Sequence, residues 1–386
     1  MHTFDDRNKH PYTKEQGDFM KQEYKTLKPY LLLWGTQTLS TLGSGMTSYA
    51  LVLWLYLQTG SALQTALLSV ASYAPYVVVS IFAGVLSDRW DKKRTVLTCD
   101  AAAALGTLAV LALLGAGALR GWHLYLINAL TGLMNSVQQP AGEVLTSLLV
   151  PRRLYQKTSG LRSFSQSLNS ILTPVLATAL FAAGGMPLVI AVDLCSFAAA
   201  FFTLWLAVPV PAALASAPTE GLLASAKAGL RWLWRERLVL KLILFLAAIN
   251  LVASAYSAAL PALVLPKPGG EAALGLINAC AGAATLLGSL LAALLPAPKN
   301  RVRAICLCLL VSMSTENFML AFGKTPLVWC AGAVAGWLLI PYMNASLDVI
   351  CRSSIPTAMQ GRVYACRNTV QFFTIPVRSE EHTSEL

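Results

Sequence analysis

Three carboxylic acids lie within long apolar stretches of the sequence, at Asp100, Asp193 and Glu316. An ionised side chain in such surroundings is costly, so acids placed there are usually paired or functional. A carboxyl group of this kind can bind and release a proton, which is the chemistry that many membrane pumps and transporters use. The three acids are therefore candidates for proton coupling, and Glu316 lies well inside its apolar stretch.

Other chemistry is poorly supported by the sequence. The four histidines are too scattered to form an imidazole metal cluster, and the eight cysteines read as small apolar residues within apolar stretches and basic loops. No phosphate-cradling Gly-x-x-x-x-Gly-Lys-Ser/Thr run occurs, which argues against direct drive by ATP. We expect no enzyme activity, no cofactor and no metal.

The elements that carry these acids are predicted to be transmembrane helices. Of 386 residues, 56% are hydrophobic and 12% are charged, about half the charged share of a soluble domain. A bilayer-spanning helix needs roughly 20 mostly apolar residues. Ten segments qualify: Tyr30–Leu57, Ser61–Leu86, Val96–Leu119, Trp122–Leu145, Ser163–Gly184, Pro187–Val208, Leu238–Leu260, Glu271–Leu295, Ala304–Phe322 and Pro326–Asp348. An eleventh begins near Asn368 and stops at Val377.

Lysine and arginine residues predict the orientation of these segments. If the segments cross a membrane in turn, 25 basic residues fall on one side and three on the other, namely Arg120, Lys267 and Lys324. Positively charged loops stay in the cytoplasm, so we expect a cytoplasmic N-terminus. The net charge of +11 then belongs to loops that face cytoplasm and lipid headgroups, and we expect no nucleic-acid partner.

The sequence also repeats itself at an offset of about 205 residues, where Glu143 corresponds to Asp348 and Arg162 corresponds to Arg367. Six segments precede the middle of the chain. The repeat therefore predicts an all-α membrane protein with two parallel six-helix halves, in which about ten complete transmembrane helices are present of twelve expected. Chance similarity between basic loops is the alternative.

These halves occupy residues 30–208 and 238–377 and leave three other segments. Residues 1–29 are predicted to be a cytoplasmic tail, and residues 209–237 a cytoplasmic linker with an amphipathic helix. Residues 378–386 resemble a translated sequencing adapter. We therefore expect a C-terminally truncated chain whose second half lacks its closing helices, with a natural acidic tail as the alternative.

The loop after the second segment carries a pattern that resembles the signature loop of the major facilitator superfamily. It reads Gly84-Val85-Leu86-Ser87-Asp88-Arg89-Trp90-Asp91-Lys92-Lys93-Arg94. Further matches are Trp34, Gln37, Ser40, Thr59–Ala62, Pro75, Tyr76, Asp100, Asp193, Ser196, Phe197 and Gly361–Tyr364. Over roughly residues 29–377 the chain resembles the macrolide-efflux branch of that superfamily, with the enterobactin-exporter branch next.

The resemblance implies a conformational latch. In the family the loop aspartate, here Asp88, faces the N-terminus of helix 11, and a loop base, here Lys92 or Lys93, pairs with the acid closing helix 4, here Glu143. The complete expected set is Gly84, Asp88, Arg89, Lys92, Lys93, Arg94, Glu143, Asp348 and Arg362. Because helix 11 is expected to be incomplete, we expect Asp88 to lack its partner. A loop retained only for topology is the alternative.

The resemblance also implies a substrate cavity lined mainly by helices 1, 4, 7 and 10. Polar and aromatic candidates on them are Gln37, Ser40, Ser44, Asn128, Asn135, Gln138, Asn250, Tyr256, Trp337, Tyr342 and Asn344. Such walls suit an amphipathic, weakly charged organic molecule, although interhelical hydrogen bonding explains any single one equally well. Helices 3, 6 and 9 are peripheral in the family, which favours structural roles for Asp100 and Asp193 and leaves Glu316 as the preferred proton site.

We therefore expect a monomeric secondary transporter of the bacterial inner membrane that exports a small drug-like or macrolide-like compound by alternating access, coupled to protons. Helix 5 has Ser170 and Thr173-Pro174 without the glycines of drug–proton antiporters, so the sequence does not secure antiport. One alternative is an exporter of a siderophore or other metabolite. A membrane sensor or lipid-handling protein without ion coupling is an alternative of a different class.

Overall fold

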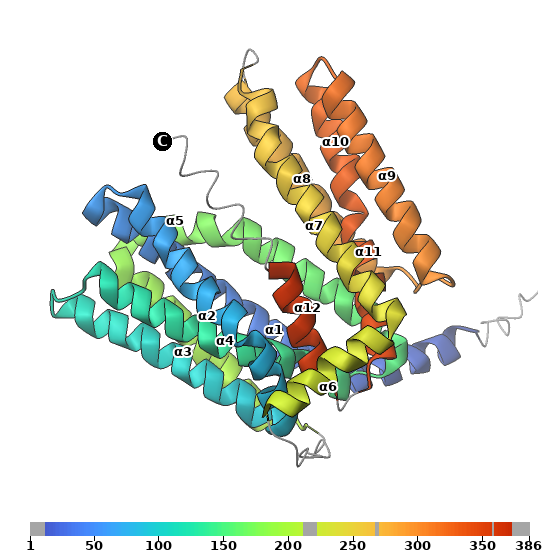
Figure 1. Cartoon of the computed structure of the whole chain (residues 1–386), viewed down its shortest axis with the longest axis horizontal. Coiled ribbons are helices and arrows are strands. Elements are labelled where there is room, and N and C mark those ends of the chain that lie inside the picture. The colour runs from blue at the N-terminus through green and yellow to red at the C-terminus, as the bar shows by residue number, and fades with distance from the viewer. Residues whose placement is uncertain (1–11, 211–221, 267–269, 357–358, 373–386) are drawn as a thin grey trace, which may run out of the picture.

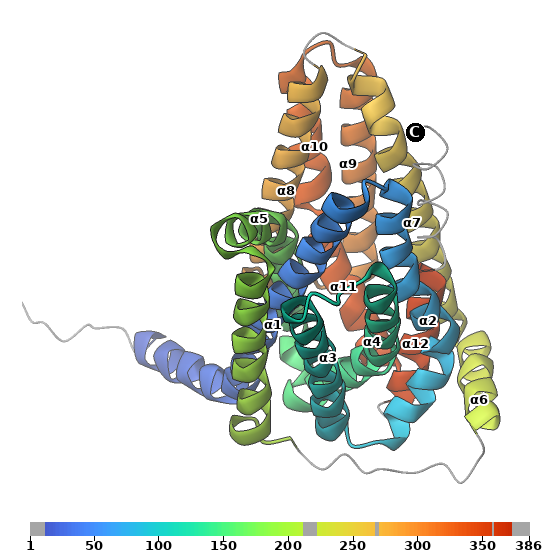
Figure 2. The ribbon, with the colours of Figure 1, turned by 90° about the vertical axis from the view of Figure 1, so that its left-hand side faces the viewer.

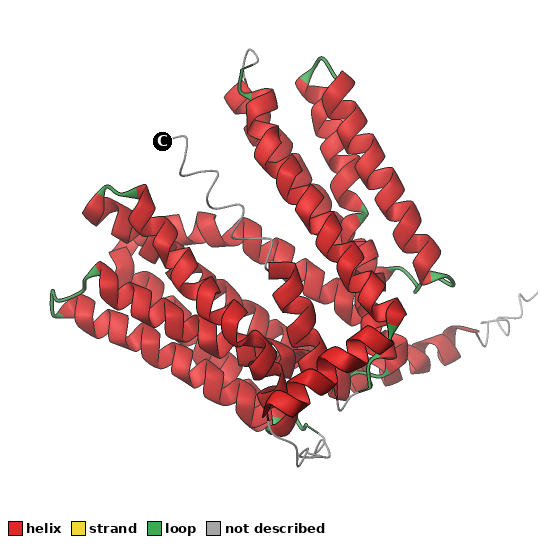
Figure 3. Ribbon diagram, in the orientation of Figure 1, coloured by secondary structure: helices red, strands yellow, loops and turns green. Residues whose placement is uncertain are grey.

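The computed structural model of the chain describes residues 12–210, 222–266, 270–356 and 359–372. Regular structure in these residues is helical throughout (Figure 3), which confirms the predicted all-α class. Helices satisfy every backbone N–H and C=O group within one segment, as lipid requires. The predicted adapter-like tail at residues 378–386, much of the linker and the start of the N-terminal tail lie outside the described residues.

Five long helices form the first half. They are α1 (Tyr12–Thr59), α2 (Ala62–Arg89), α3 (Lys92–Gly115), α4 (Gly121–Leu149) and α5 (Tyr155–Phe202), with the short helices η1 (Arg152–Leu154) and η2 (Thr203–Ala207) flanking α5. Helix α5 contains two predicted segments, because its backbone turns at Gly184 and Gly185. Gly185 has a φ of 65°, a left-handed conformation that favours glycine.

The second half follows an amphipathic linker helix, α6 (Leu222–Arg235). Its helices are α7 (Arg237–Val264), α8 (Gly270–Leu294), α9 (Arg301–Phe322), α10 (Pro326–Leu338), α11 (Ile340–Ser354) and α12 (Gln360–Phe372). The tenth predicted segment is thus divided between α10 and α11. Pro341 follows the break, and a proline inside a helix removes a hydrogen bond and clashes with the preceding turn.

The helices carry an apolar outer surface that suits lipid. Six stretches of the described helices are long and apolar enough to cross a membrane: Leu63–Ser80, Lys92–Gly115, Arg152–Ala207, Ala272–Leu294, Arg301–Phe322 and Pro326–Ser354. Large apolar side chains such as Val78, Leu105 and Phe318 are exposed on them, which in water would be an aggregation hazard. The middle of every predicted segment is helical, and the number of complete membrane crossings stays a prediction.

The two halves meet at one end of the bundle and diverge at the other. We call the meeting end the basic end, because the turns and loops between α2 and α3, α4 and α5, and α8 and α9 bring their lysine and arginine residues there. In Figure 1 the opposite ends of α1–α5 and of α7–α10 point in different directions. Contacts between the halves join α5 to α8 and α11, and α12 to α2 and α4, while α6 lies beside α2 and α12 (Figure 2).

Helix α12 corrects one sequence expectation. The eleventh segment was predicted to begin near Asn368, but the helix begins at Gln360. Polar and basic residues fill its first turns, so hydropathy alone missed them. The early start brings Gly361 and Arg362 to the helix N-terminus, where they meet Asp88. The expectation that Asp88 lacks a partner was therefore wrong.

Candidate functional site

Asp88 joins the two halves at the basic end. It lies in the last turn of α2, and its side chain is 4% exposed. One carboxylate oxygen accepts the backbone N–H of Gly361 at 2.9 Å, and the other accepts the backbone N–H of Arg362 at 3.2 Å and its side-chain Nε at 2.9 Å. The carboxylate thus satisfies donors at the N-terminus of α12, where the helix dipole favours negative charge.

Gly84 makes this approach possible. A Cβ atom at this position would lie 2.7 Å from the carbonyl oxygen of Gly361 and 2.9 Å from Cα of Arg362. Both are backbone atoms, which cannot move aside as a flexible side chain would. The absence of a side chain at Gly84 therefore allows α2 and α12 to pack backbone against backbone.

A second cluster of five ionised groups lies beside the first contact. Glu143 at the end of α4 accepts Arg162 Nη1 at 3.0 Å and Arg367 Nη2 at 2.9 Å through the same oxygen, Oε1. Asp348 on α11 pairs with Arg352 Nη2 at 3.0 Å and with Arg367 Nη1 at 3.7 Å. Because Glu143 belongs to the first half and Arg367 to the second, the cluster bridges the halves.

A third contact crosses the halves at the same place. Ser159 of α5 donates its hydroxyl to Asp348 at 2.5 Å, and a Cβ atom at the neighbouring Gly160 would lie 2.6 Å from Cα of Ala293 on α8. Glu143 and Asp348 are the two acids that the sequence repeat relates. In the structure, these two repeat-related acids belong to the same ion-pair cluster.

The predicted partners of Glu143 were wrong. Lys92 Nζ donates to the carbonyl oxygens of Ser87 at 2.5 Å, and of Asp88 and Trp90 at 2.9 Å, while Lys93 Nζ donates to Val208 O at 2.8 Å. The turn between α2 and α3 is two residues long, so the side chain of Lys92 folds back on carbonyl groups of the turn, whereas Lys93 reaches the residue that follows η2. Arginines on α5 and α12 pair with Glu143 in place of the expected lysines.

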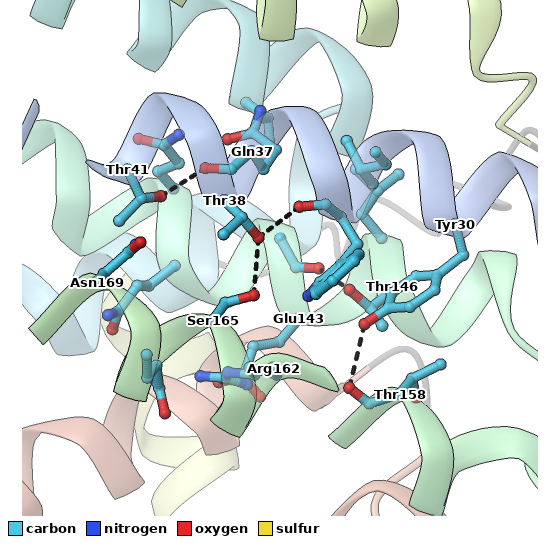
Figure 4. A pocket seen from close by; sticks show the side chains of 18 of the residues that line it. Tyr30, Gln37, Thr38, Thr41, Glu143, Thr146, Thr158, Arg162, Ser165 and Asn169 are labelled. Carbon is cyan, nitrogen blue, oxygen red and sulfur yellow. Dashed lines mark hydrogen bonds and ion pairs between the residues drawn. The ribbon is translucent and has the colours of Figure 1, made fainter. Parts of the chain in front are cut away.

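A pocket of about 320 Å³ opens beside the cluster (Figure 4). Helices α1, α3, α4 and α5 form most of its wall, and Arg352 of α11 closes one side. Two predicted cavity residues, Gln37 and Gln138, line it. The family resemblance also implied a contribution from helix 5, but none of the predicted cavity residues lies on it. The lining residues of α5 recur at helical spacing and could have been found from that period: Thr158, Arg162, Ser165, Gln166 and Asn169.

Gln37 and Gln138 also hold a buried acid. Their Nε2 groups donate to Asp100 on α3, at 3.2 Å from Gln37 and 2.5 Å from Gln138. Asp100 itself is not part of the pocket lining. This arrangement ties α1, α3 and α4 together, in keeping with the structural role expected for Asp100.

The other candidates of the first half lie outside the pocket. Ser44 donates to Asp193 at 3.1 Å, which links α1 to the second part of α5. Asn128 donates to the carbonyl oxygen of Leu124 one turn earlier, at 2.9 Å. Ser40 is buried and Asn135 is exposed.

In the second half, two predicted cavity residues come together around the predicted proton site. Trp337 Nε1 donates to Glu316 Oε1 at 2.9 Å, and the hydroxyl of Tyr256 hydrogen-bonds to the same carboxyl group. Gly336 leaves room for that carboxyl group, because a Cβ atom there would lie 2.9 Å from its carbon, Cδ. Glu316 is thereby connected to α7 and α10, the helices expected to line the cavity.

The remaining candidates of the second half are not part of that group. Tyr342 donates to the carbonyl oxygen of Pro296 at 3.3 Å. Asn344 is exposed and Asn250 is half-buried on α7. Among the described residues no group of three or more metal-ligating side chains occurs, and the eight cysteines are free.

Comparison with known proteins places this geometry in a family. Macrolide efflux protein A of Streptococcus pyogenes is 28% identical over 166 residues, which are 42% of this chain and 40% of that protein. The chain therefore matches less than half the length of that relative. Enterobactin exporter EntS of Citrobacter koseri is 25% identical over 351 residues, covering 88% of this chain and 80% of that protein.

The fold has solved counterparts. A crystal structure of a bacterial homologue of the iron transporter ferroportin in an outward-facing state superposes with a TM-score of 0.69 at 17% identity, and the match covers 92% of both chains. Residues 33–377 match the sequence family described as Major Facilitator Superfamily. Because this match spans most of the sequence, the resemblance seen in the signature loop is confirmed, and the chain belongs to the Major Facilitator Superfamily.

Proposed function

We propose that the chain is a secondary active transporter that exports a small amphipathic organic compound by alternating access. The observation that carries the proposal is the joining of the halves at the basic end by hydrogen bonds and ion pairs, directly beside a pocket. Such contacts break and re-form at modest cost when the halves rock, whereas a continuous apolar interface would resist separation. The efflux names of the two relatives support export.

In this proposal the contacts of Asp88 and Glu143 act as a latch. Asp88 holds the N-terminus of α12, and Glu143 holds Arg367 one further turn along the same helix. Both contacts exist while the opposite ends of the halves diverge (Figure 1). Opening of the basic end would break them together, and the pocket would then communicate with that side of the membrane.

The distribution of basic residues supports an orientation with the basic end in the cytoplasm of a bacterial cell. The latch then closes the cytoplasmic side, and the diverging ends face outward. Export requires that the compound enter from the cytoplasm and leave between the diverging ends. We propose a monomer, because the contacts that close the basic end, those of Asp88 with α12, of Glu143 with Arg367 and of Ser159 with Asp348, form between the two halves of one chain.

Glu316 is the proposed proton site. It is the acid that the structure connects to helices α7 and α10 through Tyr256 and Trp337. Its two donors stabilise the ionised carboxylate, and rearrangement of either donor would favour proton uptake. Asp100 and Asp193 are held by amide or hydroxyl groups of α1, and we assign them structural roles.

Inverted membrane vesicles test the function and its coupling. Wild-type vesicles with a respiratory proton gradient should accumulate a radiolabelled macrolide, and a protonophore should abolish the accumulation. Glu316→Gln should lower the energised uptake to the protonophore level. The control is Glu236→Gln, which removes an exposed acid at the basic end. Uptake by Glu316→Gln at the wild-type rate would remove this residue from the mechanism.

A siderophore or other metabolite is the second candidate substrate. It is favoured by the extent of the match to the enterobactin exporter, which covers 88% of this chain against 42% for the macrolide efflux protein. Enterobactin offered to the same energised vesicles distinguishes the two. Accumulation of neither compound above the protonophore level would count against the proposed export function.

A further inference from the structure

The pocket beside the ion-pair cluster carries charge that the proposed function leaves unexplained. Its charged lining residues are Glu143, Arg162 and Arg352. They are unequally accessible: the side chain of Arg162 is 38% exposed, that of Glu143 is 5% exposed and that of Arg352 is 2% exposed. Arg162 is therefore the most accessible of the charged side chains that line the pocket.

The cluster behind this surface has more positive than negative charge. Three guanidinium groups, those of Arg162, Arg352 and Arg367, face two carboxylates, those of Glu143 and Asp348. Each carboxylate pairs with two arginines, so its single negative charge is divided between two positively charged partners. Counted over the described side chains, the cluster therefore keeps one more positive than negative charge, which attracts an anion.

The oxygen atoms that could oppose this attraction are out of reach. Oε1 of Glu143 is paired with Arg162 and Arg367, and Oε2 is buried. Asp100 does not line the pocket, and its two oxygens accept the amide groups of Gln37 and Gln138. These amides do line the pocket, so a ligand there contacts neutral amides where it would otherwise approach an acid.

The rest of the lining defines the other half of the ligand. Leu33, Trp34, Val96 and Leu145 supply apolar surface. The hydroxyl groups of Thr38 and Ser165 also line the pocket, and Figure 4 shows the pair that they form, whose oxygens lie 2.7 Å apart. Hydroxyl groups adapt as donors to an anion. The lining therefore combines apolar side chains with guanidinium and hydroxyl groups that can donate hydrogen bonds to an anion.

We propose that this pocket selects amphipathic organic anions, in which a carboxylate, sulfonate or phosphate group lies on Arg162 and an apolar body lies against Trp34. The inference rests on the proposed function and narrows its substrate class. Guanidinium groups match the oxygens of such anions with parallel N–H donors. Arg162 commits Nη1 to Glu143, and its partly exposed side chain lines the pocket.

Equilibrium binding of matched compounds tests the inference. The purified chain in nanodiscs of zwitterionic lipid is titrated with three naphthalene compounds that carry a sulfonate, a hydroxymethyl or a trimethylammonium group. We expect the sulfonate to bind about 10-fold or more tightly than the cation, the scale of a charge-assisted hydrogen bond. Arg162→Gln should remove that preference, and Arg162→Lys should retain most of it.

Two controls keep the outcome decisive. Arg152→Gln removes an exposed base at the same end that does not line the pocket, and it should leave all three affinities unchanged. Glu143 keeps Arg367 as a partner when Arg162 is replaced. If Arg162→Gln nevertheless fails to fold, the wild-type comparison of sulfonate with cation still decides.

The outcomes separate this inference from the function beneath it. Equal affinities, a preference for the cation, or an unchanged preference in Arg162→Gln would overturn the inference even if the vesicles export a drug. Displacement of the sulfonate compound by sodium sulfate at equal concentration would also overturn it, because the site would then bind inorganic anions. Absence of energised export of every compound would count against the proposed function, while the binding data still judge the inference.

Discussion

Replacement of Glu143 by glutamine tests how the halves are held together at the basic end. The change keeps the size of the side chain and removes its charge. It leaves Arg162, Arg352 and Arg367 with Asp348 as the one remaining carboxylate of the cluster. Arg162 belongs to the same half as Glu143, so their pair does not join the halves. The pair between Glu143 and Arg367 joins them and therefore depends on closure of the basic end.

The expected cost follows from burial. The side chains of Glu143 and Arg367 are 5% and 11% exposed, with 2.9 Å between Oε1 and Nη2. Breaking a buried ion pair by removing one partner costs about 3–5 kcal/mol. If Glu143→Gln destabilises the closed basic end by about 3 kcal/mol, the equilibrium shifts about 100-fold toward the open basic end, since about 1.4 kcal/mol corresponds to a factor of ten.

Hydrogen exchange of the α12 backbone in nanodiscs measures this shift. Glu143→Gln should accelerate exchange across residues 360–367 toward the predicted factor. Asp91→Asn is the matched control, because Asp91 is an exposed acid at the same end that accepts the backbone N–H of Arg94 and lies outside the cluster. The double variant Glu143→Gln/Arg367→Gln should exchange more slowly than the single one, because it restores the cluster's net charge. Unchanged exchange in Glu143→Gln would refute this account of closure.

Three further substitutions test neighbouring contacts. Gly84→Val should accelerate exchange across the same peptide, because its Cβ would collide with the backbone of Gly361; protection equal to wild type would contradict that packing. Gln138→Leu should lower the free energy of unfolding by about 2 kcal/mol by withdrawing a donor from Asp100, as measured by thermal unfolding against Asn135→Leu as the exposed control. Trp337→Phe should reduce energised uptake in vesicles by withdrawing the indole N–H from Glu316, and wild-type uptake would separate that contact from coupling.

Much of the fold could be predicted from the sequence because a helix that crosses lipid must be long and mostly apolar. Every segment found by length and hydropathy is helical at its centre, and the turn in α5 lies at the predicted boundary at Gly184. Family resemblance indicated the N-terminus of helix 11, here α12, as the partner of Asp88, but the expected truncation led to the wrong prediction that this partner is missing. Hydropathy placed the start of that helix too late, because the residues that make the contact are polar and basic.

The partners of the buried charges could not be read from the sequence. The family resemblance made Lys92 or Lys93 the expected partner of Glu143, yet Lys92 folds back onto carbonyl groups of its own turn and Lys93 binds the carbonyl group of Val208. Glu143 is instead paired by Arg162 and Arg367, which lie on two other helices. Which arginine reaches an acid depends on how far two helices are rotated and displaced, and that is a property of packing.

The repeat explains why the cluster can serve as a switch. Glu143 and Arg162 in the first half correspond to Asp348 and Arg367 in the second, and the acid and base of each pair also lie within contact of one another. The additional pair between Glu143 and Arg367 therefore joins groups that each already have a partner within their own half. Separation of the halves breaks the cross-pair but leaves no carboxylate alone. Under the proposed alternating access, the open state would then avoid the full cost of an unpaired buried charge, and we expect the open and closed states to lie close in free energy.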